Sequence, residues 1–167
     1  LIYSIIFLTF TNLVFAENSR FIDFSKVLNE SKAGAQAQQI LKKKLDDALK
    51  NFSKTEENLK KEEQKLIAQK KIISKEEYQV KLEELRKKVF NYQKSKEKKL
   101  NDIGKLRSDA RSKLLAKLNP VIKKYMEDNK IRLVLDKKAV LLGDNKLEIT
   151  KEIINILNKE LTSLNIK

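Results

Sequence analysis

The feature that most constrains this chain is a long stretch without helix breakers that carries a seven-residue apolar repeat. Between residues 31 and 73 the only glycine is Gly34, and there is no proline, so nothing there interrupts a helix. The apolar residues that recur every seven positions are Leu45, Phe52, Leu59, Leu66, Ile73 and Val80. Such a repeat is typical of a coiled coil. Beyond Leu49 the second core position of each heptad is polar, so we expect a long helix that packs along a narrow apolar stripe.

A second helix is predicted to follow directly. Ser74 and Glu77 have the spacing of a capping box, in which the serine hydroxyl accepts a hydrogen bond from the glutamate amide. The apolar positions of this helix are Leu82, Leu85, Val89, Tyr92, Leu100, Ile103, Leu106, Ala110 and Leu114. A short connection makes the two helices an antiparallel hairpin. We therefore expect a hairpin arm over residues 41–118, with its tip near residues 72–75.

Asn119 and Pro120 mark the predicted end of the arm, because proline removes a backbone donor and biases the preceding residue away from helix. Val121, Ile122 and the residues after them continue an apolar helical face, so a kink is the alternative to a stop. Gly104, inside the returning helix, is either a hinge or a glycine that the helix tolerates.

Short stretches with strand character lie on both sides of the arm. Residues 131–135 alternate with a period of two and residues 139–142 form a second apolar run, which predicts a β-hairpin with its turn at 136–138. Residues 21–24 also have strand character, and a short helix is predicted at 25–28. Because the arm is a hairpin, it brings both regions together. We therefore expect three short strands to form one small body.

The end of the chain adds a last helix to this body. Thr150 is its predicted N-cap, and its apolar face consists of Ile153, Leu157, Leu161 and Leu164. Because such a small body buries little surface, we expect it to complete its core against other copies of the chain. The predicted fold class is α+β and mostly helical, with a β-strand body over residues 17–40 and 119–167 and a coiled-coil hairpin arm.

Residues 1–16 carry no charge and end in Ala16. The run is shorter than the roughly 20 residues of a membrane span, and it resembles a cleaved secretory signal peptide. A membrane anchor is the alternative. No initiator methionine or basic segment precedes the run, so we expect the sequence to begin inside the peptide. Export would place the mature chain, from near Glu17, outside the cytoplasm.

The chain is strongly basic, and most of the excess charge lies on the arm. Lys and Arg number 37 against 23 Asp and Glu, a net charge of +14. Residues 40–118 hold 24 basic and 13 acidic residues, a net charge of +11. Such a surface attracts nucleic acid, lipid headgroups or acidic polypeptides. A solvated coiled coil with ion pairs along its helices is the alternative that needs no partner.

Several classes of site are excluded by residue type. The chain has no cysteine and no histidine, which excludes a Cys/His metal site, a cysteine nucleophile and a Ser-His-Asp triad. The adjacent carboxylates at 46–47 and 62–63 lie on an exposed helix and point apart, without a cleft that would shift a pKa. There is no glycine-rich phosphate loop. We therefore expect no enzyme activity, no cofactor and no metal.

Motifs at both ends of the mature chain carry a family resemblance. The first is IDFSKVLNESKAGAQAQQIL, with Ile22-Asp23, Val27-Leu28, Ser31, Gly34 and Leu41; a charged helical hairpin follows, and then LVLDKKAVL and LEITKEIINILN. In this order they resemble the Skp family of periplasmic chaperones, also called the OmpH family, over essentially the whole mature chain. Skp-like proteins are homotrimers in which a small β-body carries hairpin tentacles around a cavity that holds unfolded outer-membrane proteins. The resemblance therefore implies an ATP-independent holdase of the Gram-negative periplasm.

Two sets of residues become candidates for these roles. The candidate oligomer interface or body core comprises Phe21, Ile22, Phe24, Val27, Leu28, Ile131, Leu133, Leu135, Val140 and Leu141. The candidate client contacts on the arm are Phe52, Leu59, Leu66, Val89 and Tyr92, for which packing of one arm helix on the other is the alternative.

Other partners and functions follow from the same features. The family implies contact with an anionic lipid or lipopolysaccharide surface, for which the sequence gives no residue assignment. A structural coiled-coil spacer of the cell envelope is an alternative function. A basic nucleic-acid-binding coiled coil is another, but export argues against it, and we expect no nucleic-acid partner.

Overall fold

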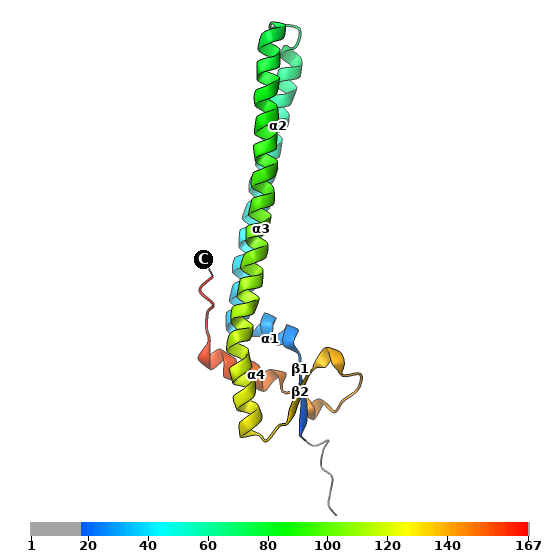
Figure 1. Cartoon of the computed structure of the whole chain (residues 1–167), viewed down its shortest axis with the longest axis vertical. Helices are drawn as coiled ribbons and strands as arrows, with labels where there is room; N and C mark the ends of the chain where they lie inside the picture. Colours follow the sequence, from blue (N-terminus) through cyan, green and yellow to red (C-terminus); the bar gives the residue numbers. More distant parts are fainter. Residues whose placement is uncertain (1–17, 167) are drawn as a thin grey trace, which may run out of the picture.

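The computed structural model describes residues 18–166, which form a long helical hairpin on a small mixed body (Figure 1). In chain order the elements are strand β1 (Ser19–Ile22), helices α1 (Phe24–Glu30), α2 (Lys32–Gln69) and α3 (Lys75–Asp128), strand β2 (Leu133–Asp136) and helix α4 (Thr150–Glu160). Single 3₁₀ turns at Lys137–Ala139 and Asn145–Leu147 lie between β2 and α4. The predicted α+β, mostly helical class is confirmed. The signal peptide expected over residues 1–16 lies outside the described residues.

Helices α2 and α3 form the predicted arm. Helix α2 has 38 residues, which corresponds to a length on the order of 57 Å. Residues 70–74 connect it to α3, and the Ser74 hydroxyl accepts a hydrogen bond from the Glu77 amide at 3.1 Å. Ser31 caps α2 in the same way, with its hydroxyl 3.3 Å from the Gly34 amide nitrogen. The predicted hairpin and its Ser74 cap are confirmed.

The seam between the two arm helices is narrow. Leu66 is buried, whereas Leu45, Phe52 and Leu59 are half-buried. Val80, which the repeat also includes, is 59% exposed. It lies beyond the turn, on a helix that runs in the opposite direction, so the repeat of α2 does not continue through it. The arm is therefore held by few apolar contacts, as the polar second heptad positions predict.

The predicted helix stop at Pro120 is wrong, because the helix continues beyond this residue; a kink at Pro120, the alternative to a stop, stays a prediction. Helix α3 passes through Pro120 and ends at Asp128. Proline inside a helix costs about 3 kcal/mol. The neighbouring Leu118, Val121 and Ile122 are all buried in the body, and each contributes roughly 1.5–3 kcal/mol on burial. Their combined burial outweighs the cost of the proline.

The strands differ in part from the expected arrangement. Strand β2 pairs with β1, as predicted for the two ends of the arm, and the pairing is parallel with Ser19 opposite Leu133 and Ile22 opposite Asp136. The predicted β-hairpin over residues 131–142 is wrong, because residues 140–142 are not a strand. The Asp136 carboxylate accepts a hydrogen bond from the Lys138 amide at 3.0 Å, which stabilises a 3₁₀ turn after β2. The described residues thus contain two strands, where three were predicted.

The body core lies where α4 and the lower end of α3 meet β1 and α1. Its fully buried side chains include Ile22, Val27, Leu118, Ile153 and Leu157. They come from β1, α1, α3 and α4, so the core depends on the return of the chain through the arm.

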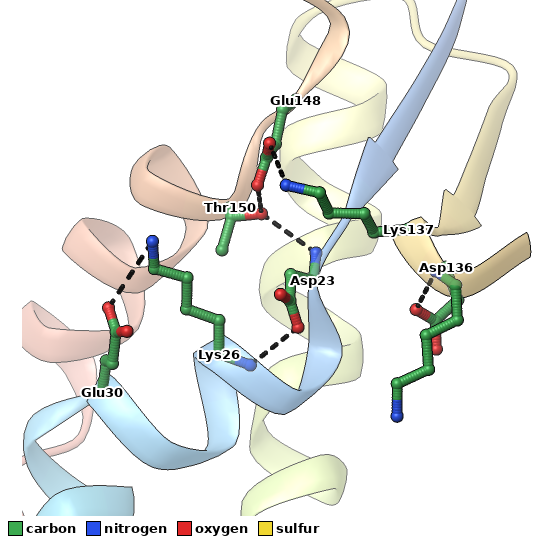
Figure 2. Close-up of polar contacts among 8 residues, drawn as sticks. Asp23, Lys26, Glu30, Asp136, Lys137, Glu148 and Thr150 are labelled. Carbon is green, nitrogen blue, oxygen red and sulfur yellow. Dashed lines mark hydrogen bonds and ion pairs between the residues drawn. The ribbon is translucent and has the colours of Figure 1, made fainter. Parts of the chain in front are cut away.

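A polar link ties the start of the chain to α4 (Figure 2). Thr150 is the first residue of α4 and not its N-cap, which corrects the prediction. Its buried hydroxyl accepts a hydrogen bond from the Asp23 amide at 2.9 Å and donates one to the Glu148 carboxylate at 2.8 Å. Glu148 also pairs with Lys137 at 2.8 Å. A hydroxyl used for this contact between distant segments is not free to cap its own helix.

Candidate functional site

The residues predicted for the body core or oligomer interface fall into two groups. Phe21, Ile22, Val27 and Ile131 are buried, and Phe24 and Leu28 pack partly buried against the core. Leu133, Leu135 and Leu141, in contrast, are exposed, and Val140 is half-buried. The exposed leucines are therefore not core residues of a single chain. Their role in an interface between copies stays a prediction.

Local structure explains why these leucines face outward. Along β2 the side chains alternate, so that Val134 packs against the core while Leu133 and Leu135 point the other way. The segment after β2 passes close to β1, since a Cβ added at Gly143 would lie only 3.1 Å from the Phe21 ring. Leu141 and Leu142 in this segment are 95% and 91% exposed. The body thus leaves a group of large apolar side chains in contact with water.

The candidate client contacts on the arm lie along the seam between α2 and α3. Leu66 is buried, and Phe52, Leu59, Val89 and Tyr92 are half-buried. Packing between the helices, the alternative stated for these residues, accounts for this burial. Their contact with a client stays a prediction.

An open groove brings three of these five residues together. Leu59, Val89 and Tyr92 lie in it with Leu82 and Leu85, between α2 and α3 in the half of the arm nearer the tip. The charged and polar side chains that surround this apolar floor are Glu56, Lys60, Glu63, Arg86 and Gln93. Phe90 also lines the groove and is 65% exposed. We call this feature the arm groove.

A compact polar and aromatic cluster fixes one end of the arm groove. The Tyr92 hydroxyl donates a hydrogen bond to the Glu56 carboxylate at 2.5 Å, and the Lys96 ammonium pairs with the same oxygen at 2.7 Å. The Tyr92 and Phe52 rings meet edge to face, with centroids 6.3 Å apart. The hydrogen bond from Lys96, and then that from Tyr92, lower the pKa of Glu56. Glu56 of α2 thus contacts both Tyr92 and Lys96 of α3 at this level of the arm.

The large apolar side chains that the arm exposes are Leu49, Ile67, Ile72, Val80, Phe90 and Leu100. Val80 belongs to the seven-residue repeat and Leu100 to the apolar positions of the returning helix. Ile67, Ile72 and Phe90 lie outside both patterns, so a search for these patterns passes over them. Phe90 could have been found as a large aromatic residue beside the stripe, on a helix that is otherwise highly charged. Within residues 18–166, Phe90 is the most exposed aromatic side chain among the large hydrophobic residues.

Other kinds of site find little support in the described part of the chain. No helix there is long and apolar enough to cross a bilayer. Among residues 18–166, no three acidic side chains converge as metal ligands would.

Comparison with known proteins places this architecture in a family. The family model described as outer membrane protein, OmpH-like, matches residues 20–157. The chain belongs to the OmpH-like family. A search of curated proteins finds no match. One similar solved structure is that of an OmpH-like outer membrane chaperone from Caulobacter crescentus CB15. It aligns with this chain with a TM-score of 0.82 and 19% sequence identity, and the alignment covers 89% of this chain and 88% of that one.

Each comparison supports a different statement. At 19% identity the Caulobacter crescentus structure shows a shared fold, in which a long helical hairpin stands on a small body. The family match extends from β1 into α4 and so includes the body and the whole OmpH-like arm. The resemblance found in the sequence motifs is confirmed at the level of the OmpH-like outer membrane chaperone family.

Proposed function

We propose that this OmpH-like protein is an ATP-independent holdase that binds unfolded outer-membrane proteins in the periplasm and prevents their aggregation. The observation that carries the proposal is the arm groove, an apolar floor on a basic arm that no other segment of residues 18–166 fills. An unfolded β-barrel precursor exposes apolar side chains. Charge on the arm brings an acidic precursor close, and the groove offers contacts that need no particular sequence.

The proposal includes assembly into a homotrimer through the body. Leu133, Leu135 and Leu141 are exposed in the single chain, and exposed clusters of large apolar side chains mark interaction sites. Assembly would place several arms around a shared space, so that one client meets several grooves at once. Multiple weak contacts then hold the client more tightly than any single groove could. The same basic arms would be attracted to an anionic lipid or lipopolysaccharide surface.

The first test measures aggregation. A urea-unfolded outer-membrane β-barrel protein is diluted into buffer with and without residues 17–167, and light scattering is followed. We expect suppression at about three chains per client, as a trimer requires. Suppression should weaken as salt rises from about 0.05 to 0.5 M, because the screening length falls to a few ångströms. No suppression at any salt concentration would contradict the holdase function and favour the structural spacer.

A second test addresses the arm groove. Replacing Phe90 by serine removes the most accessible aromatic side chain of the groove without disturbing the seam. Complete burial of an aromatic side chain contributes about 1.5–3 kcal/mol. If a bound client buries about half of the Phe90 side chain, its loss should weaken the affinity for that client roughly tenfold. The matched control is Val80→Ser, which changes a 59% exposed residue of the same helix that does not line the groove. Equal losses in both variants would remove the groove from the mechanism.

A further inference from the structure

A small cavity lies at the base of the arm, away from the arm groove. It has a volume of about 260 Å³ and lies where α1, α2 and α3 meet the segment that follows α4. Its apolar floor consists of Leu28, Ala37, Leu41, Ala110 and Leu114. Ordinary small-molecule sites measure about 300–1,000 Å³. This cavity therefore has room for about one residue of a ligand and not for a long segment.

The charged side chains at this cavity are all basic. Arg107 and Arg111 reach it from α3, Lys138 reaches it from the turn after β2, and none of the carboxylates in residues 18–166 lines it. The two arginines are four residues apart on one helix, where like charges repel each other. Within the described residues neither guanidinium takes part in a hydrogen bond or ion pair. The cavity thus combines an apolar floor with two guanidinium groups to which this part of the chain supplies no counter-charge.

The segment after α4 shows that this surface accepts an irregular apolar peptide. Residues 162–166 are not helical and run beside the lower part of the arm (Figure 1). Leu164 and Ile166 pack against Ala37, Leu41 and Ala110, and Leu164 forms part of the cavity wall. The chain's own peptide therefore forms part of the wall of this site.

We propose that this cavity binds the C-terminal residue of an unfolded client, with its apolar side chain on the floor and its free carboxylate on Arg107 and Arg111. The C-terminal residue is the one position in a polypeptide that carries both an apolar side chain and a carboxylate, whereas an internal residue offers one or the other. A guanidinium group pairs with a carboxylate through two parallel hydrogen bonds. The proposal rests on the proposed function, because a holdase is the kind of protein that meets unfolded chain ends.

The test compares three short fluorescent peptides of alternating serine and valine that end in leucine. The first has a free terminal carboxylate, the second a terminal amide, and the third a terminal amide with one internal serine replaced by glutamate. The first and third carry the same charge, so general attraction to a basic protein cannot distinguish them. We expect the free carboxylate to bind about tenfold more tightly than either amide, since hydrogen bonds to charged groups are among the strongest.

The double variant R107Q/R111Q should abolish this preference. Both side chains are exposed, so the fold should tolerate glutamine, and thermal unfolding followed by circular dichroism checks this. The matched control K98Q/K99Q removes the same charge from α3 outside the cavity and should keep the preference. Equal binding of the first and third peptides, or a preference that survives in R107Q/R111Q, would overturn the assignment. The aggregation assay separates the two proposals. A wild-type protein that suppresses aggregation but does not distinguish the peptides refutes only the cavity assignment, whereas a wild-type protein that does not suppress aggregation refutes the holdase.

Discussion

Replacing Leu133 and Leu135 together by aspartate is expected to reduce the proposed homotrimer to single chains. The two side chains are 47% and 39% exposed and lie on the same face of β2. Assembly through this face would bury both, and a buried carboxylate without a partner costs several kcal/mol. Because each copy contributes the same surface to a closed assembly, every chain of the variant adds its own buried carboxylates, and the free-energy cost rises with each chain. Size-exclusion chromatography with light scattering measures the mass.

A matched pair on the arm provides the control for this experiment. Leu49 and Leu100 are 50% and 39% exposed, close to the values for the two leucines of β2. Replacing both by aspartate changes charge and apolar surface by the same amounts but leaves the body intact. This control variant should keep the mass of the assembled wild type. A trimer mass in the β2 variant would show that the strand face is not the interface.

The arm could be predicted from sequence because local rules determine it. The absence of breakers between residues 35 and 73, the serine cap at Ser74, and the apolar repeat all act within a few residues of one another. None of them depends on where the rest of the chain lies. The hairpin, its tip and its narrow seam follow from them. Pro120 is the exception, because the burial of its apolar neighbours in the body stabilises the helix by more than the proline destabilises it.

The body could be predicted only in outline, because contacts between distant residues decide its details. Alternation in residues 131–135 predicts a strand but cannot give its partner or direction. The choice between a hairpin and a parallel pair depends on β1, more than a hundred residues earlier. Thr150 has the residue type of an N-cap, yet its hydroxyl bonds to the Asp23 amide across the body. Such a competition between a local and a distant partner leaves no trace in the nearby sequence.

The candidate site also has features that the nearby sequence predicts and features that only the packed structure shows. Leu59 is predicted from the seven-residue repeat, and Val89 and Tyr92 are predicted from the apolar spacing of the second helix; all three lie together in the arm groove. The repeat finds residues that two helices bury against each other, so it passes over side chains that remain open to a partner. Phe90 and the arginines of the basal cavity belong to this second class. Their surroundings become visible only once α2 and α3 are packed together.

Replacing Gly34 by alanine is expected to lower the free energy of unfolding by about 3 kcal/mol, a typical upper cost of overpacking in a full site. Gly34 lies in the first turn of α2, where α1 and α2 meet. A Cβ there would lie 1.9 Å from the Leu28 carbonyl oxygen and 2.9 Å from the Ser31 hydroxyl. The first of these atoms belongs to the backbone and cannot move without displacing α1. Urea unfolding at a fixed protein concentration measures the loss, because the proposed assembly would make stability depend on concentration.

Gly104→Ala is the matched control and should change stability in the opposite direction. A Cβ at Gly104 would meet no atom within 4 Å, and alanine in a helix interior is more stable than glycine by about 0.5–1 kcal/mol. The same chemical change should therefore destabilise the protein where α1 crosses α2 and stabilise it in the arm. Equal stability of Gly34→Ala and the wild type would show that α1 can move away from α2, and the close packing of these helices would then not hold the body together. A destabilised Gly104→Ala variant would instead indicate that the arm needs the freedom of a glycine hinge at that position.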